Sequence, residues 1–346
     1  MEWKQTGIRR KQDTLEKGVS LSMSRKKILV SYPLKPEGLE ELMARFDVRI
    51  PDKGAASKSG LLEAVQGCHG ILAAGMVIDE EVMDAAPELK IISVYGAGYD
   101  DVDVKAATER GIVVTNIPDT VTDSTAEITL GLMLSVMRRI AECDRKLRTD
   151  SNFKWGMTIN MGRSLHGKEL GIIGMGRIGK AVAKRAAAFG MRISYYTRKR
   201  LDPVIEMELG ASYKRMDELI RTADVISIHT PLTRETRHLI GYRELSMMKP
   251  EAYLINTSRG AVVDEQALVK CLAEGKPAGA GLDVFENEPV ISPELLEMDN
   301  VVVTPHIGTD TIETRLSMNR ESAQNIINFF SGRQLFHVIN PEVLQK

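Results

Sequence analysis

Short apolar runs alternate with longer amphipathic segments along almost the whole chain from Lys26. Five apolar runs precede Pro118, within KILVSY, DVRI, GILAA, LKIISVYG and IVVTN. About six more follow in the second half, within LGIIG, RISYY, VISIH, AYLINTS, AGAGLD and VVVTP. Parallel strands need long, usually helical crossovers, so this alternation is typical of parallel α/β sheets. The chain is therefore predicted to contain two such sheets.

The length of 346 residues suits two domains. The boundary between them is not expected at the middle of the chain. The last amphipathic segment, ETRLSMNRESAQNIINFFSGR, is long enough to cross back to the first sheet. We therefore predict a discontinuous first domain of residues 23–120 plus 308–346 and an inserted second domain of residues 121–307. Residues 1–22 show no usable period and are expected to form a disordered extension, or to precede a natural start at Met23. Two chain crossings would make a hinge, with a ligand cleft between the domains.

A helix is predicted over residues 124–140, where the first domain passes into the second. Ser124 and Glu127 have capping-box spacing, and a broad apolar face follows them. Such a face fits a core helix, or a core helix that also forms a subunit interface.

Composition excludes several classes of function. Lys plus Arg total 46 against 47 Asp plus Glu, so no polycationic surface is expected for nucleic acid. Three scattered cysteines are too few for a disulfide framework, which favours a reducing, cytoplasmic setting. No apolar run is long enough to span a bilayer and no signal peptide is evident. We expect a protein without membrane association and without a metal site.

The segment Gly174-Met-Gly176-Arg177-Ile178-Gly179 is a GxGxxG motif. It follows the apolar run Leu170–Ile173 and precedes the helical segment AVAKRAAAFG, which is the strand, turn and helix context that the motif requires. The glycines allow a tight turn, close approach of a pyrophosphate and close helix packing, and the helix N-terminus favours phosphate charge. The motif predicts dinucleotide binding.

The end of the second strand of this domain indicates which dinucleotide. An NAD site carries an acid there for the ribose 2′-hydroxyl, but this chain has Thr197, followed by Arg198, Lys199 and Arg200. A hydroxyl and three cations suit a 2′-phosphate. The sequence favours NADP(H), with NAD(H) as the alternative; each cation could also belong to a solvated loop.

Catalytic candidates follow three later strands. Arg259 follows AYLIN, Asp283 and Glu288 lie in GLDVFENEP, and His306 lies in TPHIG. The carboxyl ends of parallel strands face the ligand crevice, so these side chains can converge. Taken singly, each residue has a structural alternative. Arg259 could be a surface cation and Asp283 a helix cap. Glu288 could be a solvated acid and His306 a hinge histidine.

Reduction of a ketone requires a proton donor, a cation for the substrate carboxylate and an acid that keeps the donor protonated. His306 suits the donor because its pKa can be tuned across pH 7, and Glu288 suits the acid that raises this pKa. Arg259 suits the two-point clamp on the carboxylate. His229, after VISIH, is expected to touch the cofactor.

These motifs resemble those of the D-isomer-specific 2-hydroxyacid dehydrogenases. GMGRIG at 174–179, NTSRGAVVDEQAL at 256–268, GLDVFENEP at 281–289 and TPHIG at 304–308 occur in that family's order and spacing. The resemblance spans Lys26 to Pro341. The fold class expected is α/β, with two doubly wound parallel-sheet domains: a flavodoxin-like substrate domain and a Rossmann NAD(P)-binding domain.

The resemblance also implies residue roles. It makes Arg259 the substrate-orienting cation, Glu288 and His306 the acid–histidine pair, and Asp283 a contact on the nicotinamide side. It implies that the backbone of Gly96, Ala97 and Gly98 binds the substrate carboxylate. Further cofactor contacts are expected at Thr125, His229, Pro231, Thr257 and Gly308.

The resemblance implies a homodimer formed through the cofactor domain. Trp155 aligns with a tryptophan that reaches the partner's active site in some members, although core packing is an equal alternative. The segments YYTRKR and PLTRETRHLI look most like the glyoxylate and hydroxypyruvate reductase branch. We therefore expect NADPH-dependent reduction of a small 2-oxo acid to the D-2-hydroxy acid. The alternatives are an NAD-dependent D-2-hydroxyacid or phosphoglycerate dehydrogenase and a dinucleotide-sensing corepressor.

Overall fold

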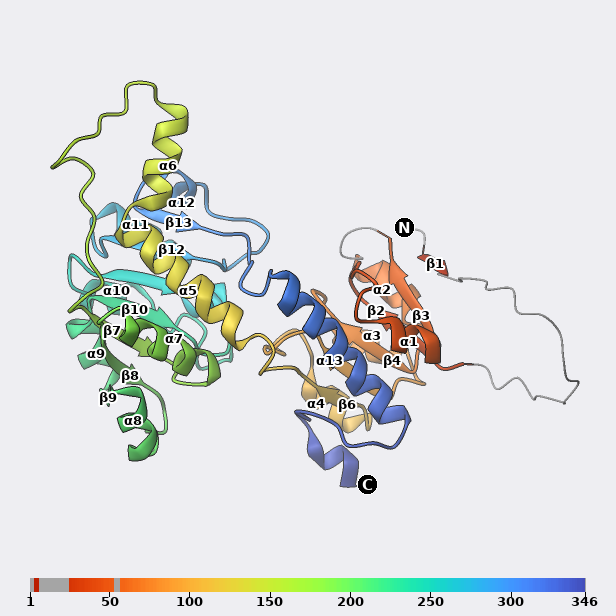
Figure 1. Cartoon of the computed structure of the whole chain (residues 1–346). Coiled ribbons are helices and arrows are strands. Elements are labelled where there is room, and N and C mark those ends of the chain that lie inside the picture. Colours follow the sequence, from red (N-terminus) through yellow and green to blue (C-terminus); the bar gives the residue numbers. More distant parts are fainter. Residues whose placement is uncertain (1–2, 6–24, 53–56, 346) are drawn as a thin grey trace, which may run out of the picture. The chain divides into compact units, whose positions relative to one another are not determined.

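A computed structural model describes residues 3–5, 25–52 and 57–345 of the chain (Figure 1). Contacts divide the chain into two compact units. One unit runs to Val121 and resumes at Thr311, and the other covers Thr122–Asp310. Each unit is built on its own mainly parallel sheet, in agreement with the predicted α/β fold class. That the two units are separate functional domains stays a prediction.

The sheet of the first unit has the strand order β1-β3-β2-β4-β5-β6, in which the five strands after β1 are parallel. This is the flavodoxin-like order. β4 and β5 are buried throughout, which is typical of strands covered on both faces. In chain order the parallel strands are β2 (Lys27–Val30), β3 (Asp47–Pro51), β4 (Gly70–Ala73), β5 (Ile91–Val94) and β6 (Val113–Thr115).

Helices cover both faces of this sheet. The long C-terminal helix α13 (Ile312–Phe330) packs on one face beside α1 (Glu40–Arg45). The expected return of the last helix to the first sheet is therefore observed. The other face carries α2 (Lys58–Ala64), α3 (Glu80–Asp84) and α4 (Val104–Glu109). The last turn, η2, covers Pro341–Gln345.

The first 22 residues were expected to form a disordered extension. Most of them lie outside the described residues. Trp3–Gln5, however, form strand β1, which pairs antiparallel with β3 at Arg49–Pro51. At these three residues the structure shows a strand in place of disorder.

The second unit contains seven parallel strands rather than about six, in the order β13-β12-β11-β10-β7-β8-β9. The strand missed by the sequence analysis is β9, whose three residues ASY give too short a pattern to recognise. Strand order reverses between β7 and β10, and such switch points of doubly wound sheets hold ligands. In chain order the strands are β7 (Glu169–Ile173), β8 (Arg192–Tyr196), β9 (Ala211–Tyr213), β10 (Val225–Ile228), β11 (Tyr253–Asn256), β12 (Gly279–Leu282) and β13 (Val301–Val303).

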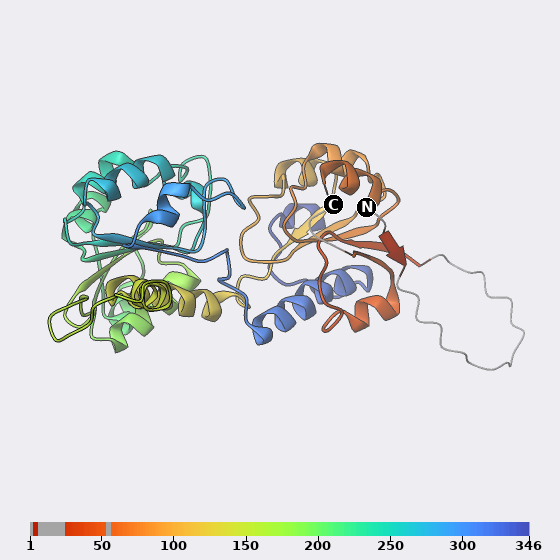
Figure 2. The same cartoon turned by 90° about the horizontal axis from the view of Figure 1, so that it is seen from above.

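Two helical layers enclose this sheet (Figure 2). One layer is formed by α5 (Thr122–Met137), α7 (Arg177–Ala188) and α8 (Pro203–Leu209). The opposite layer is formed by α9 (Met216–Thr222), α10 (Tyr242–Met247), α11 (Glu265–Ala273) and α12 (Pro293–Glu297). The short turn η1 covers Gly260–Val262.

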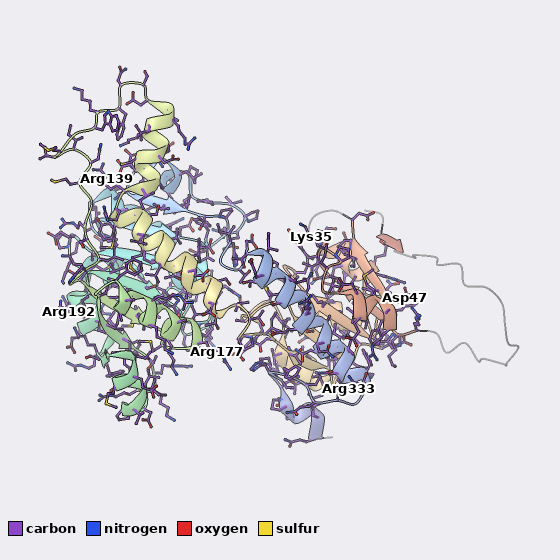
Figure 3. All side chains as sticks on the ribbon, in the orientation of Figure 1. Lys35, Asp47, Arg139, Arg177, Arg192 and Arg333 are labelled. Carbon is purple, nitrogen blue, oxygen red and sulfur yellow. The ribbon has the colours of Figure 1, made fainter. Side chains whose placement is uncertain are left out.

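The helix predicted over 124–140 is two helices. α5 ends at Met137, and α6 (Ile140–Thr149) starts after Arg139, which has a left-handed backbone with φ 56° (Figure 3). The backbone N–H of Arg163 donates to the carbonyl of Met137 at 2.7 Å, which satisfies one of the terminal helix carbonyls. α5 packs on α7 and on β11, β12 and β13, so it is a core helix.

Within the part of the chain that the structure describes, no helix combines the length and apolar character that crossing a bilayer requires.

Candidate active site

The glycine-rich turn joins β7 to α7 as predicted from the sequence. Gly174 has φ 99°, and a Cβ there would lie 2.6 Å from the carbonyl carbon of His229. A Cβ on Gly179 would lie 2.3 Å from the carbonyl oxygen of Gly174. These two glycines therefore allow the turn to sit against β10 and the helix to sit against the turn.

Gly176 differs from the other two glycines because a Cβ on it would meet nothing within 4 Å. It is the N-cap of α7, whose first residue is Arg177 (Figure 3). Gly176 and Arg177 are exposed and Ile178 is half-buried. Open space above an uncapped helix N-terminus fits a pyrophosphate, because backbone N–H groups there lack helical acceptors.

The carboxyl end of β10 carries two buried polar atoms without a hydrogen-bond partner among the described residues, His229 Nδ1 and Thr230 Oγ1. The other ring nitrogen of His229 lies 2.7 Å from Ser227 Oγ. Burial lowers the pKa of His229 to about 3, so its imidazole is neutral. Unpaired buried polar atoms at the switch point fit a site completed by a polar ligand. The carbonyl of Pro231, close by in the chain, accepts from Thr236 Oγ1 at 2.7 Å.

The end of β8 holds the four residues proposed for a 2′-phosphate. The Thr197 hydroxyl donates to the carbonyl of Lys199 at 2.7 Å, and Arg198 and Lys199 are exposed. The charge of Arg198 helps to lower the pKa of Glu235, mainly set by the Thr233 hydroxyl. Arg198 therefore lies near Glu235, which belongs to the loop that follows β10.

Arg200 is bound by a carboxylate of the protein itself. Its Nε and Nη2 donate to the two carboxylate oxygens of Glu206, both at 2.8 Å. This two-point ion pair engages the guanidinium within the protein. Among the described residues Arg198 and Lys199 have no such ion pair, and contact of any of the three cations with a 2′-phosphate stays a prediction.

His306 and Glu288 form a hydrogen-bonded pair, with Nδ1 of the imidazole 2.8 Å from Oε2 of the carboxylate. The second carboxylate oxygen accepts from the backbone N–H of Phe285 at 3.0 Å. The bond to Glu288 raises the pKa of His306, against the opposing effect of burial. Burial opposes ionisation of Glu288, but the bond to His306 prevails and lowers its pKa. The carboxylate of Glu288 therefore favours the protonated form of the His306 imidazole.

Arg259 lies near this pair, because its positive charge acts on the pKa values of both members. It follows β11, and its carbonyl accepts from the side-chain amide of Asn256 at 3.0 Å. The Asn256 amide oxygen accepts from the N–H and hydroxyl of Ser258. Next in the chain, a Cβ on Gly260 would lie 1.9 Å from the carbonyl carbon of Phe285. The turn carrying Arg259 is therefore packed directly on the segment that leads to Glu288.

Asp283 anchors the loop that carries His306. Its carboxylate accepts from Thr304 Oγ1 at 2.6 Å and from the backbone N–H groups of Ile307 and Gly308, both at 2.8 Å. Burial raises its pKa, against these hydrogen bonds. Asp283 does not cap a helix, so that alternative is wrong. Its contact with a nicotinamide stays a prediction.

Three other predicted cofactor residues lie around Asp283 and α5. A Cβ on Gly308 would lie 3.1 Å from Asp283 Oδ2 and 3.7 Å from Thr125 Oγ1. Thr257 and Thr129 share a hydroxyl hydrogen bond of 2.8 Å, and Thr129 also donates to the carbonyl of Thr125. The fold thus gathers these residues at one end of the sheet.

The loop Gly96-Ala97-Gly98 follows β5 in the first unit. The carbonyl of Gly96 accepts from Ile117 N–H at 3.0 Å, and that of Ala97 accepts from the Asn116 amide at 2.7 Å. Among the described residues, nothing accepts from the three backbone N–H groups of this loop. These donors can therefore bind an anionic ligand.

Sequence reasoning missed Asn256, Thr304 and Glu206. The first two could have been found as polar residues at or just after the carboxyl ends of buried strands. Glu206 lies one turn into the helix that Asp202-Pro203 starts, close enough in the chain to pair with Arg200. Trp155 was left open between a partner contact and core packing; its side chain is 82% exposed, so core packing is wrong.

No group of three or more metal-ligating His, Cys, Asp or Glu side chains occurs among residues 3–5, 25–52 and 57–345.

Comparisons with known proteins match both the motifs and the fold. The family model described as D-isomer specific 2-hydroxyacid dehydrogenase, NAD binding domain, matches residues 130–308. The glyoxylate reductase of Thermococcus litoralis is 44% identical over 324 residues, covering 92% of this chain and 98% of that protein.

Solved structures agree with the sequence relatives. A glyoxylate reductase from Paecilomyes thermophila has a TM-score of 0.83 and 35% identity, covering 94% of this chain and 100% of that one. An NADPH-dependent glyoxylate/hydroxypyruvate reductase from Sinorhizobium meliloti, in complex with NADP and malonate, has a TM-score of 0.81 and 34% identity. This match covers 91% of this chain and 97% of that one.

Proposed function

The chain belongs to the D-isomer-specific 2-hydroxyacid dehydrogenase family of NAD(P)-dependent oxidoreductases, and from this premise we propose that it uses NADPH to reduce a small 2-oxo acid. Glyoxylate and hydroxypyruvate are the favoured substrates, with the D-2-hydroxy acid as the product where the new carbon is chiral. The resemblance expected from the motifs is thereby confirmed. The observation that carries the proposed chemistry is the pair of His306 and Glu288 beside Arg259.

His306 is the proton donor in this proposal. When bound, the reduced cofactor supplies the hydride for the carbonyl carbon. The imidazolium of His306 gives its proton to the carbonyl oxygen, so one hydride and one proton complete the reduction to an alcohol. Glu288 holds Nδ1, which leaves Nε2 to face the substrate oxygen. The carboxylate also stabilises the imidazolium before the transfer.

Arg259 and the Gly96–Gly98 loop bind the substrate in this proposal. A guanidinium can hold a carboxylate at two points and polarise the neighbouring carbonyl. The backbone N–H groups of Gly96, Ala97 and Gly98 add neutral donors for the carboxylate. A 2-oxo acid presents both groups on adjacent carbons, which explains why the same cation can serve both.

The preference for NADPH rests on the end of β8. No carboxylate occupies the position after Tyr196, and Asp202 is used as the N-cap of α8, where it accepts from Val204 N–H at 2.8 Å. Arg198 and Lys199 are exposed cations in the same loop. The NADP complex of the Sinorhizobium meliloti relative supports this choice.

A substrate and cofactor panel tests the proposal. Initial rates of NADPH and NADH oxidation are measured with glyoxylate, hydroxypyruvate, pyruvate and bulkier 2-oxo acids. We expect the highest kcat/KM for NADPH with glyoxylate or hydroxypyruvate. A higher kcat/KM for NADH would instead support the NAD-dependent alternative, and absence of turnover with every acid would contradict the reductase proposal.

A second copy of the chain is the proposed partner, as the resemblance implies. The segment after α6 exposes four large apolar side chains, Trp155 at 82%, Met157 at 102%, Ile159 at 47% and Met161 at 70%. Apolar side chains gathered on one segment favour a protein partner. Sedimentation velocity at micromolar concentration should give the mass of a dimer. A monomer at every concentration would contradict this assignment.

A further inference from the structure

We propose that Glu206 is a positioning residue for cofactor discrimination. Through Arg200 and Tyr195, it fixes the loop of residues 197–202 in the shape that offers Arg198 and Lys199 to a 2′-phosphate. This inference rests on the proposed use of NADPH and adds to it a residue that does not itself touch the cofactor.

Glu206 lies in α8 and is 8% exposed. Its carboxylate binds Arg200 at two points, and the Arg200 guanidinium also lies 5.8 Å from the centre of the Tyr213 ring. A two-point pair fixes the orientation of a guanidinium as well as its position. One face of the loop is therefore tied to α8 and β9.

Tyr195 provides the second attachment. Its side chain is fully buried under the loop, and its hydroxyl donates to Glu206 Oε1 at 2.5 Å. The same hydroxyl oxygen accepts from the backbone N–H of Leu201 at 2.9 Å. Glu206 and Tyr195 thus hold the side chain of Arg200 and the backbone of the next residue with one connected set of hydrogen bonds.

The two attachments leave a short exposed stretch between them. At its start the Thr197 hydroxyl donates to the carbonyl of Lys199. The side chains of Arg198 and Lys199 have no ion-pair partner within 4 Å among the described residues, whereas Arg200 has Glu206. Of three consecutive cations, the fold therefore engages the third and leaves the first two for a ligand.

Such pre-organisation matters because an exposed cationic loop otherwise loses conformational entropy when it binds phosphate. The cost falls on the cofactor that carries the 2′-phosphate and not on NADH. Loosening the loop should therefore weaken NADPH selectively. The bond to Arg200, helped by Tyr195, lowers the pKa of Glu206 to about 2, so this carboxylate stays ionised and paired with Arg200 at neutral pH.

Two other ionisable groups share the surroundings of the loop. Glu235 lies near Arg198 in the loop after β10, and Asp202 caps α8. Neither binds Arg200, so removing Glu206 leaves that cation without its partner. If the freed Arg200 bound the phosphate, NADPH would be favoured more strongly, whereas a loosened loop disfavours NADPH. The direction of the change in cofactor preference therefore distinguishes the two cases.

The test compares kcat/KM for NADPH and NADH at saturating glyoxylate in the wild type and in Glu206→Gln. We expect the NADPH-to-NADH ratio to fall roughly three- to tenfold, through a higher KM for NADPH, with kcat and the NADH values unchanged. Tyr195→Phe should lower the ratio in the same direction. An unchanged ratio overturns the proposal. A higher ratio also overturns it, because it would show that Arg200 binds the phosphate when released.

Glu169→Gln is the matched control. Glu169 is another largely buried carboxylate, at the start of β7, where it accepts from Lys214 Nζ at 2.6 Å and Ser194 Oγ at 2.8 Å. This variant should lower the melting temperature without changing the ratio. A ratio lowered as much as in Glu206→Gln would show a general effect of destabilisation and would defeat the proposal.

Two further variants complete the design. If Glu206→Gln fails to fold, Arg200→Met removes the same pair from its more exposed side and should lower the ratio similarly. Arg198→Ala separates this inference from the function beneath it. If Arg198→Ala lowers the NADPH-to-NADH ratio of kcat/KM and Glu206→Gln does not, only the positioning role of Glu206 is rejected. If Arg198→Ala leaves the ratio unchanged, the phosphate contact itself is rejected.

Discussion

Nδ1 of His306 lies 2.8 Å from Oε2 of Glu288, a residue 18 positions earlier in the chain. His306 has a left-handed backbone with φ 53°, as do His238 and His337, and histidine is one of the few residue types besides glycine in which this conformation recurs. Its N–H donates to the carbonyl of Asp283 at 2.9 Å, and the Asp283 carboxylate binds the next two N–H groups. Three hydrogen bonds to Asp283 thus fix the backbone at the residue proposed to transfer the proton.

Glu288→Gln should move the pH dependence of reduction. The carboxylate raises the pKa of His306, so the wild-type imidazole keeps its proton to higher pH than a free one. Donation fails as pH rises through this pKa. Without the negative charge, the alkaline fall of kcat/KM should move to lower pH. The measurement is the pH profile of kcat/KM for glyoxylate reduction.

The reverse reaction gives the control for this assignment. Oxidation of the hydroxy acid needs neutral His306 as the base, so its rate should rise with pH where that of reduction falls. Glu288→Gln should shift both profiles toward lower pH. Profiles that keep their wild-type midpoints in the variant would show that Glu288 does not control the pKa of His306.

His306→Asn should lower kcat by about 10²- to 10⁴-fold, the usual contribution of a positioned acid–base group. Asparagine is chosen because it tolerates a positive φ better than alanine does. NADPH affinity, measured by fluorescence titration, should stay within about twofold of the wild-type value if only proton transfer is lost. Substantial turnover in both His306→Asn and His306→Ala would remove His306 from the donor role.

Arg198→Ala should lower the NADPH-to-NADH ratio of kcat/KM by ~1–3 kcal/mol, or roughly five- to 150-fold, if a charged hydrogen bond to phosphate is lost. Arg192→Ala provides a matched control, because Arg192 is an exposed arginine at the opposite end of the same strand (Figure 3). This control should leave the ratio unchanged. Equal effects of the two variants would indicate long-range charge rather than a contact.

Gly176→Ala and Gly179→Ala should separate cofactor binding from folding. A methyl group on Gly176 meets open space, so the melting temperature should hold while both NADPH and NADH bind more weakly by about 1–3 kcal/mol. A methyl group on Gly179 would strike the carbonyl of Gly174, so that variant should lose thermal stability as well. Calorimetric melting and cofactor titration check both. Wild-type cofactor affinity in Gly176→Ala would place the pyrophosphate elsewhere.

Several elements could be predicted because they depend on local patterns. Strands such as β4, β5 and β10 are continuous apolar runs, since both faces of a parallel sheet are covered. The glycine motif was recognisable because its backbone requirements fall on consecutive residues. β9 and the break at Arg139 were missed, since three residues carry too weak a period and a left-handed arginine has no sequence signal.

The sequence by itself determined the family, the two α/β sheets and the kinds of side chain at the active site, because periodicity and motif spacing encode them within a few residues. Only the tertiary structure decided how those side chains are used. Arg200 stands beside Arg198 in the chain, yet it pairs with Glu206, while Asp283 holds the loop of His306. The physical reason is competition between partners: a charged side chain binds the oppositely charged or polar group that the fold brings within reach, and only packing determines which group that is.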